Sequence, residues 1–162
     1  MKLPLDFLHR STDGQRIQHL RGMSLFKELS TRELREVDEL LHERTYQKDE
    51  IIFDEGDVGL GLFIVVTGRV RVISSHASLQ QLAPEFCCGD FFGEMSLFDQ
   101  EPRSARVVAS EPAMVAALFR REFFSLLERN RSIGVKILFE LSRTVIVRSR
   151  RLLLQQKHLP SL

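Results

Sequence analysis

The chain has 162 residues, the length of one ordinary domain, and its 43% apolar and 28% charged residues are typical of a globular protein. Its 23 Lys and Arg residues against 22 Asp and Glu leave a net charge of +1, which argues against nucleic-acid binding by bulk charge. No stretch approaches the roughly 20 apolar residues of a membrane span. The only cysteines, Cys87 and Cys88, are adjacent, which is not a disulfide framework. We therefore expect a reduced, cytoplasmic protein with no membrane contact, no metal and no cofactor.

The first part of the chain is expected to be helical after a short arm. Residues 1–22 have no clear period and are interpreted as an N-terminal arm with one short helix at most. Ser30 and Glu33 have the spacing of a capping box, in which each side chain bonds the backbone N–H of the other. Apolar residues follow at helical spacing, so we predict a helix over about 31–42, preceded by a short turn at 25–29.

A change of pattern near Arg44 predicts a β-rich region. Short apolar runs alternate with turn signals such as Gly56 and Gly68. The expected strands are 51–53, 62–67, 69–73, 78–82, 106–109 and 114–119. Strands of this length and spacing predict an antiparallel β-roll or jelly roll of about eight strands, so the fold class is mainly β with flanking helices.

Helical spacing returns after Arg120, with a short helix at 122–128 and a long one at 131–157 that Asn130 caps. Apolar positions surround much of the long helix, so it must bury two faces. Four apolar positions and one arginine fall at coiled-coil spacing: Leu138, Leu141, Val145, Leu152 and Arg148. We expect this stripe to be exposed and to form a homodimer through about 134–154.

These elements give a single domain at 23–157. It divides into a helical part at 23–43, a β-roll at 44–119 and lid or dimer helices at 120–157, with a tail at 158–162. The segment that carries chemistry lies between two predicted strands of the roll. There, Arg103 offers a planar donor fork suited to phosphate, and Glu94 can accept protons from sugar hydroxyls. Gly93 permits close backbone approach, and a helical turn at Ser96 can direct N–H groups at an anion.

This segment resembles the phosphate-binding cassette of cyclic-nucleotide-binding domains, which occur in catabolite activator proteins, gated channels and cyclic-nucleotide-dependent kinases. The resemblance rests on Phe92-Gly93-Glu94-Met95-Ser96-Leu97 followed by Pro102-Arg103-Ser104-Ala105, with Glu55-Gly56-Asp57 and Thr67-Gly68-Arg69-Val70 matching two hairpin turns of the family. It extends over about 25–154. Two departures are Ser96, where Ala or Gly is commoner, and Arg106, where Thr or Ser is frequent; the second puts the purine preference in doubt.

The resemblance implies a role for each site residue. Glu94 would hold the ribose 2′-hydroxyl, Arg103 would pair with the cyclic phosphate, and Ser104 would add a donor. From the long helix, Arg148 would stack on the purine and Ser149 would hydrogen-bond it, although a place in the dimer seam or in solvent suits Arg148 as well. The full candidate set is Phe92, Gly93, Glu94, Met95, Ser96, Arg103, Ser104, Ala105, Arg148 and Ser149.

The expected function is therefore a regulatory sensor that binds a cyclic purine mononucleotide, cAMP in the first place and cGMP as the alternative. No general base, nucleophile or metal cluster accompanies Glu94 and Arg103, so no enzymatic activity is expected. Two other interpretations stay open: a dimerising interaction domain that no longer responds to nucleotide, and the sensor fragment of a transcription factor. Nucleic acid is not an expected partner of this chain by itself.

Overall fold

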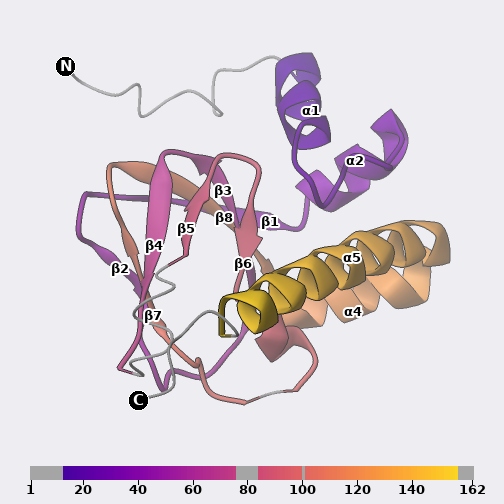
Figure 1. Ribbon diagram of the computed structural model, residues 1–162. Helices are drawn as coiled ribbons and strands as arrows, with labels where there is room; N and C mark the ends of the chain where they lie inside the picture. Colours follow the sequence, from indigo (N-terminus) through magenta and orange to yellow (C-terminus); the bar gives the residue numbers. More distant parts are fainter. Residues whose placement is uncertain (1–12, 76–83, 100, 157–162) are drawn as a thin grey trace.

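The computed structural model describes residues 13–75, 84–99 and 101–156 (Figure 1). Two helices come first, α1 at Asp13–Arg21 and α2 at Thr31–Asp38. The strands described are β1 Leu41–Tyr46, β2 Ile51–Phe53, β3 Gly61–Thr67, β4 Arg69–Ile73, β5 Glu85–Cys87, β6 Phe91–Phe92, β7 Arg106–Ala109 and β8 Ala113–Phe119. A single 3-10 turn, η1 Met95–Leu97, lies between β6 and β7, and helices α4 Arg120–Arg129 and α5 Arg131–Gln156 follow.

The strands form two four-stranded antiparallel sheets, in the orders β1-β8-β3-β6 and β2-β7-β4-β5. The apolar faces of both sheets point inward, as expected for a roll with one solvated surface. The prediction of a mainly β fold with flanking helices is therefore confirmed. The strand predicted at 78–82 lies outside the described residues, whereas β5 and β6 had not been predicted, because strands of two or three residues leave no periodic signal.

The first helix agrees with the expectation of one short helix in the N-terminal arm, whereas the second helix ends earlier than expected. Ile17 and Leu20 in α1 are each 3% exposed and belong to the main core, so the end of the expected arm is a packed helix. Helix α2 ends at Asp38 and β1 begins at Leu41, whereas the helix was expected to continue to about residue 42. The reason is the ladder with β8, which pairs every residue of β1 and satisfies its backbone groups better than another helical turn would.

The long helix α5 buries one face and exposes the opposite one. Ile133, Ile137 and Leu141 are at most 2% exposed and pack in the core beside α4, which runs along α5 (Figure 1). The exposed apolar residues of α5 are Val135, Phe139, Ile146, Val147, Leu153 and Leu154. The predicted exposed stripe is therefore wrong in register: Leu138 and Leu141 pack against the core and Val145 lines a cavity, while the Leu152 side chain lies outside the described residues.

Helix α5 is tied to α2 and to the turn before it by two ion pairs in which the carboxylate is buried and the lysine is partly exposed. The Lys136 ammonium contacts a Glu33 carboxylate oxygen at 2.7 Å, and Lys27 contacts the buried Glu140 at 3.0 Å. Glu33 also closes the predicted capping box by accepting from the Ser30 backbone N–H at 2.7 Å. Burial alone would raise the pKa of Glu33, but hydrogen bonds from Lys136, Ser30 and Ser132 outweigh it and lower the pKa from 4.5 to about 2.

Glu33→Gln should lower the free energy of unfolding by about 1–3 kcal/mol at pH 7, because the variant loses the ion pair while the site stays buried. A carboxyl whose pKa is lowered by folding stabilises the protein above its unfolded pKa and loses that effect as the pH falls towards its folded pKa. The difference between wild type and variant should thus shrink as the pH falls from 4.5 to about 2. Urea titrations across this range test it, with the exposed Glu39→Gln as the control. A difference independent of pH would contradict the assignment.

Candidate functional site

The ten residues singled out in the sequence surround one cavity of about 490 Å³. It lies between the segment from β6 to β7 and the C-terminal half of α5. The structure adds lining residues that sequence analysis missed: Phe53, Val72, Phe86, Asp99, Glu101, Pro102, Val107 and Val145. The aromatic and aliphatic side chains among them lie on β2, β4, β5, β7 and α5, which are far apart in the sequence. Only the folded chain brings them together. A cavity of this size, mostly apolar with a few convergent polar groups, is typical of small-molecule sites.

Arg103 is the most constrained polar group of the cavity, since it is only 5% exposed. Its guanidinium donates to the carbonyl oxygens of Gly93 at 2.8 Å and Gly61 at 2.7 Å, and to the Ser96 hydroxyl at 3.0 Å. It also lies 4.2 Å above the ring of Phe53. All these acceptors are neutral, and no carboxylate of the described residues forms an ion pair with Arg103.

The electrostatics of Arg103 follow from this arrangement. Burial lowers the pKa of Arg103, and the negative charges of Asp57 and Glu94 only partly oppose that effect. Its Nε–H has no hydrogen-bond acceptor in the described structure. A buried cation without an ion-pair partner is costly, and an anion in the cavity would supply the missing charge. The site is therefore chemically suited to a negatively charged ligand.

Gly93 and Ser96 hold Arg103 in place. Gly93 has a backbone φ of +72°, which other residues rarely adopt, and a Cβ there would lie 2.6 Å from Nη1 of Arg103. Ser96 sits in the 3-10 turn η1 and is 4% exposed. The predicted helical turn at this point is thus confirmed, and its serine bonds the arginine that follows seven residues later.

Glu94 is the least exposed of the three acidic residues that line the cavity, and its side chain is 12% exposed. One of its oxygens, Oε1, accepts a hydrogen bond of 3.2 Å from Nη1 of Arg148 on α5. Arg148 also donates to the Phe91 carbonyl oxygen at 2.6 Å, and its guanidinium lies 4.9 Å from the Phe86 ring centroid and 4.8 Å from that of Phe91. Arg148 therefore lines the cavity, with 27% of its side chain exposed.

The other candidates lie at the rim. Met95 is 61% exposed, and Ser104 and Ser149 are exposed as well, while Ala105 is 8% exposed beside them. Arg106, the departure from the family pattern, does not line the cavity. Its guanidinium instead donates two hydrogen bonds of 2.8 Å to the Asp54 carboxylate on the surface. The Arg106 side chain therefore has a partner within the protein and needs no ligand.

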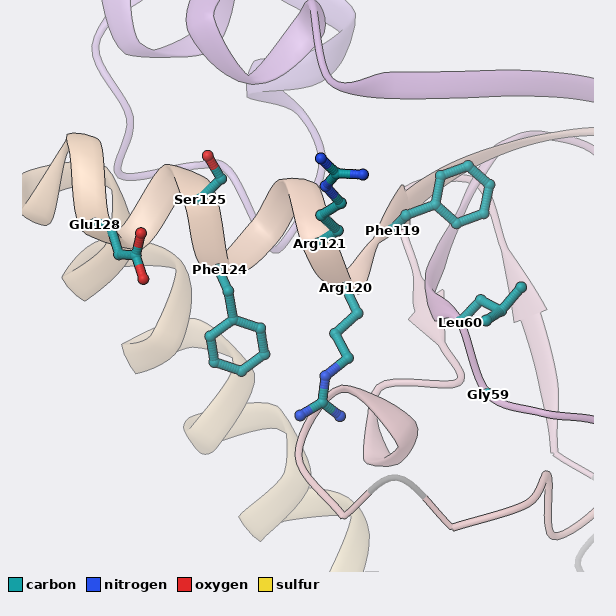
Figure 2. Close-up of a pocket in the computed structure, with 8 residues that line it drawn as sticks. All are labelled: Gly59, Leu60, Phe119, Arg120, Arg121, Phe124, Ser125 and Glu128. Carbon is teal, nitrogen blue, oxygen red and sulfur yellow. The ribbon is translucent and has the colours of Figure 1, made fainter.

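A larger and shallower groove of about 970 Å³ lies on the other side of η1. Figure 2 shows Arg120 and Phe124 projecting from the same side of α4, with Leu60 and Gly59 on a neighbouring segment. Nη1 of Arg120 donates to the Ser96 carbonyl oxygen at 3.3 Å, and its guanidinium lies 5.2 Å from the Phe124 ring centroid. The groove thus contacts the outer side of the site, but neither Glu94 nor Arg103 lines it.

Comparison with known proteins agrees with this geometry. The profile of the cyclic nucleotide-binding domain family matches residues 43–130, and the chain belongs to that family. It is 36% identical over 115 residues to the cyclic AMP receptor protein of Thermus thermophilus, an alignment that covers 68% of this chain and 51% of the receptor. It is 31% identical over 118 residues to human cGMP-dependent protein kinase 2, covering 72% of this chain and 16% of the kinase. The chain thus spans about half of the first relative and a small part of the second.

Solved structures give the same answer for the fold. A cyclic nucleotide-binding domain from Methylobacillus flagellatus superimposes with a TM-score of 0.76 at 28% identity, covering 93% of this chain and 86% of that one. The catabolite activator protein of Thermus thermophilus superimposes with a TM-score of 0.67 at 30% identity, covering 82% and 63%. Within the described residues, no helix has the length and apolar character needed to cross a membrane.

Gly93→Ala should be more destabilising than the same change at Gly56. Both glycines have positive φ, but a Cβ at Gly56 meets no atom within 4 Å, whereas at Gly93 it meets Arg103. Gly56→Ala should cost about 1–2 kcal/mol for the backbone alone, and Gly93→Ala about 1 kcal/mol more as Arg103 is displaced. Denaturant unfolding of both variants measures the difference. Equal losses would show that Gly93 is needed only for its backbone conformation.

Proposed function

We propose that this protein binds a cyclic purine mononucleotide reversibly in the cavity, as a regulatory sensor, with cAMP as the first candidate and cGMP as the second. The observation that carries the proposal is the buried Arg103, which has neutral acceptors only and lies in the same cavity as Glu94. An anionic phosphate and a hydroxyl-bearing sugar joined in one small molecule match these two groups. The activity proposed is binding, with no reaction on the nucleotide.

The phosphate would meet Arg103, whose position beside Gly93 and Ser96 is fixed before any ligand enters. A preorganised guanidinium loses little conformational freedom on binding, which favours affinity. The Ser104 hydroxyl at the rim of the cavity can add a donor to the phosphate. The sugar would then reach Glu94, and the purine would occupy the apolar part of the cavity beside Phe86 and Val145, where Ser149 can reach its edge.

The identity of the purine is the finer part of the proposal. Ser104 suits either nucleotide, because a hydroxyl at this point can reach phosphate or a guanine amino group. Relatives are named for both ligands: the Thermus receptor for cyclic AMP and the human kinase for cGMP. Parallel calorimetric titrations with cAMP and cGMP decide between them. The same titrations test the alternative of a scaffold that no longer binds nucleotide. The presence of both Arg103 and Glu94 does not favour that alternative.

Arg103→Ala should weaken nucleotide binding by roughly 30- to several-thousand-fold, because it leaves the phosphate without its counter-charge in a desolvated site. Calorimetry measures the loss, and circular dichroism confirms that the variant is folded. Arg106→Ala is the matched control, since it removes an arginine three residues away whose partner is Asp54 on the surface. Binding of the Arg103 variant within a few-fold of wild type would refute the site.

We also propose that the sensor is a homodimer through the exposed face of α5. Phe139, Ile146 and Leu153 are 67%, 52% and 61% exposed and recur every seven residues, the repeat of a coiled-coil seam. This face lies opposite the one that packs in the core, so pairing would not disturb the cavity. Two copies of one helix related by a twofold axis are the simplest way to bury such a stripe.

Ile146→Asp should therefore weaken self-association by at least about tenfold, since it places a charge in an apolar seam. Analytical ultracentrifugation of the ligand-free and nucleotide-saturated protein measures this. Ile51→Asp makes the same change at a 44% exposed isoleucine on β2 and should leave association unchanged. A wild-type protein that is monomeric at all concentrations in both states would rule the dimer out.

A further inference from the structure

We infer that Arg148 is a positioning residue for sugar recognition: it holds the Glu94 carboxylate in the orientation that receives the ribose 2′-hydroxyl, and so couples the docking of α5 to that contact. The inference rests on the proposed function. Its observation is separate, namely a guanidinium on α5 that bonds two acceptors on the roll, the Phe91 carbonyl and the Glu94 carboxylate.

The position of Arg148 is set mainly by groups other than Glu94. The shorter of its two hydrogen bonds, 2.6 Å from Nη2, goes to the Phe91 carbonyl oxygen of β6. The faces of Phe86 and Phe91 lie within 5 Å of the guanidinium and add cation–π attraction. The longer bond, 3.2 Å from Nη1, then reaches Glu94. Glu94 is thus oriented by an arginine that is itself already fixed.

This arrangement leaves Glu94 ready for one more donor. A carboxylate has two oxygens, and only Oε1 accepts from Arg148, while no described residue donates a hydrogen bond to Oε2. The Glu94 side chain is 12% exposed and lines the cavity, and Oε2 is not one of the buried polar atoms, so a group in the cavity can reach it. A hydroxyl group in the cavity would donate to Oε2, and the charge of Arg148 would keep the carboxylate in place while it does so.

The second consequence concerns α5. No described residue of α5 beyond Leu141 is buried, so few contacts hold this half of the helix to the roll. Within the described residues, Arg148 provides two hydrogen bonds from this half to the roll, one to Phe91 and one to Glu94. A ligand that fills the free side of Glu94 therefore also strengthens the attachment of α5. A ligand without the 2′-hydroxyl would occupy the cavity and leave this attachment unchanged.

The test compares cAMP with its 2′-deoxy analogue by calorimetry on wild type, Arg148→Ala, Arg148→Lys and the control Arg150→Ala. Arg150 is exposed on the same helix, so its removal changes the net charge equally. Wild type and the control should prefer cAMP by about tenfold or more, the usual effect of a lost hydrogen bond to a charged group. Arg148→Ala should reduce the preference to within about threefold, mostly by losing affinity for cAMP.

The lysine variant distinguishes positioning from charge alone. A single ammonium cannot bond Phe91 and Glu94 as the planar guanidinium does, so Arg148→Lys should recover only part of the preference. Glu94→Gln should also reduce the preference, and adding Arg148→Ala to it should cause little further loss, because both residues act on the same hydroxyl. If the alanine variant were unstable, the lysine variant combined with Glu94→Gln would give the same comparison.

Three results would overturn the inference. Equal weakening of both ligands would make Arg148 a general lid contact. Tighter cAMP binding by Arg148→Ala would mean that Arg148 competes with the sugar for Glu94. Unchanged affinity for both ligands would mean that Glu94 needs no orientation by α5. These results differ from failure of the proposed function, in which wild type binds neither cAMP nor cGMP and both proposals fall.

Discussion

The site depends on one buried guanidinium that lacks a negative partner. Arg103 is surrounded by the Gly93 and Gly61 carbonyls, the Ser96 hydroxyl and the Phe53 ring. These groups position the side chain, but none of them carries a negative charge. Gly93, the 3-10 turn at Ser96 and the start of β3 at Gly61 all contact this side chain. The protein thus stabilises an unfavourable charge with local hydrogen bonds, and the imbalance that remains is the driving force for an anion.

Around this centre, α5 has two different tasks on its two faces. The buried face continues the core and is joined to α2 by the Glu33–Lys136 pair, while the same helix carries Arg148 into the cavity. The opposite face is apolar and exposed, as the Phe139 and Ile146 side chains show. One helix therefore contributes residues to the core, to the cavity and to an exposed apolar face.

Much of this could be predicted from the sequence, where local signals are strong. The capping box at Ser30, the glycine turns at Gly56 and Gly68 and the strand at 69–73 each depend on neighbouring residues, and all are found in the structure. The ten candidate residues line one cavity, and eight of them could be grouped in advance because they fall between Phe92 and Ala105 in the chain.

Features that depend on distant contacts could not be predicted. The register of α5 is one example: the set containing Leu138 and Val145 and the set containing Phe139 and Ile146 both repeat every seven residues. Spacing cannot tell which set meets the core. Strand β1 is another, because its pairing with β8, some 70 residues later, overrides a helical pattern. The partners of Arg148 likewise follow from folding alone.

Because its buried residues end at Leu141, helix α5 is held firmly at one end only. Residues 131–141 are held in the core by Ile133, Ile137 and Leu141, whereas the remainder to Gln156 has no buried residue in the described part. At 1.5 Å per residue the part of α5 beyond Leu141 is about 22 Å long. A rotation of about 10° at Leu141 would therefore displace the end of the helix by about 4 Å. A hydrogen bond at Arg148, roughly halfway along, therefore restrains a movement that is about twice as large at the end of the helix.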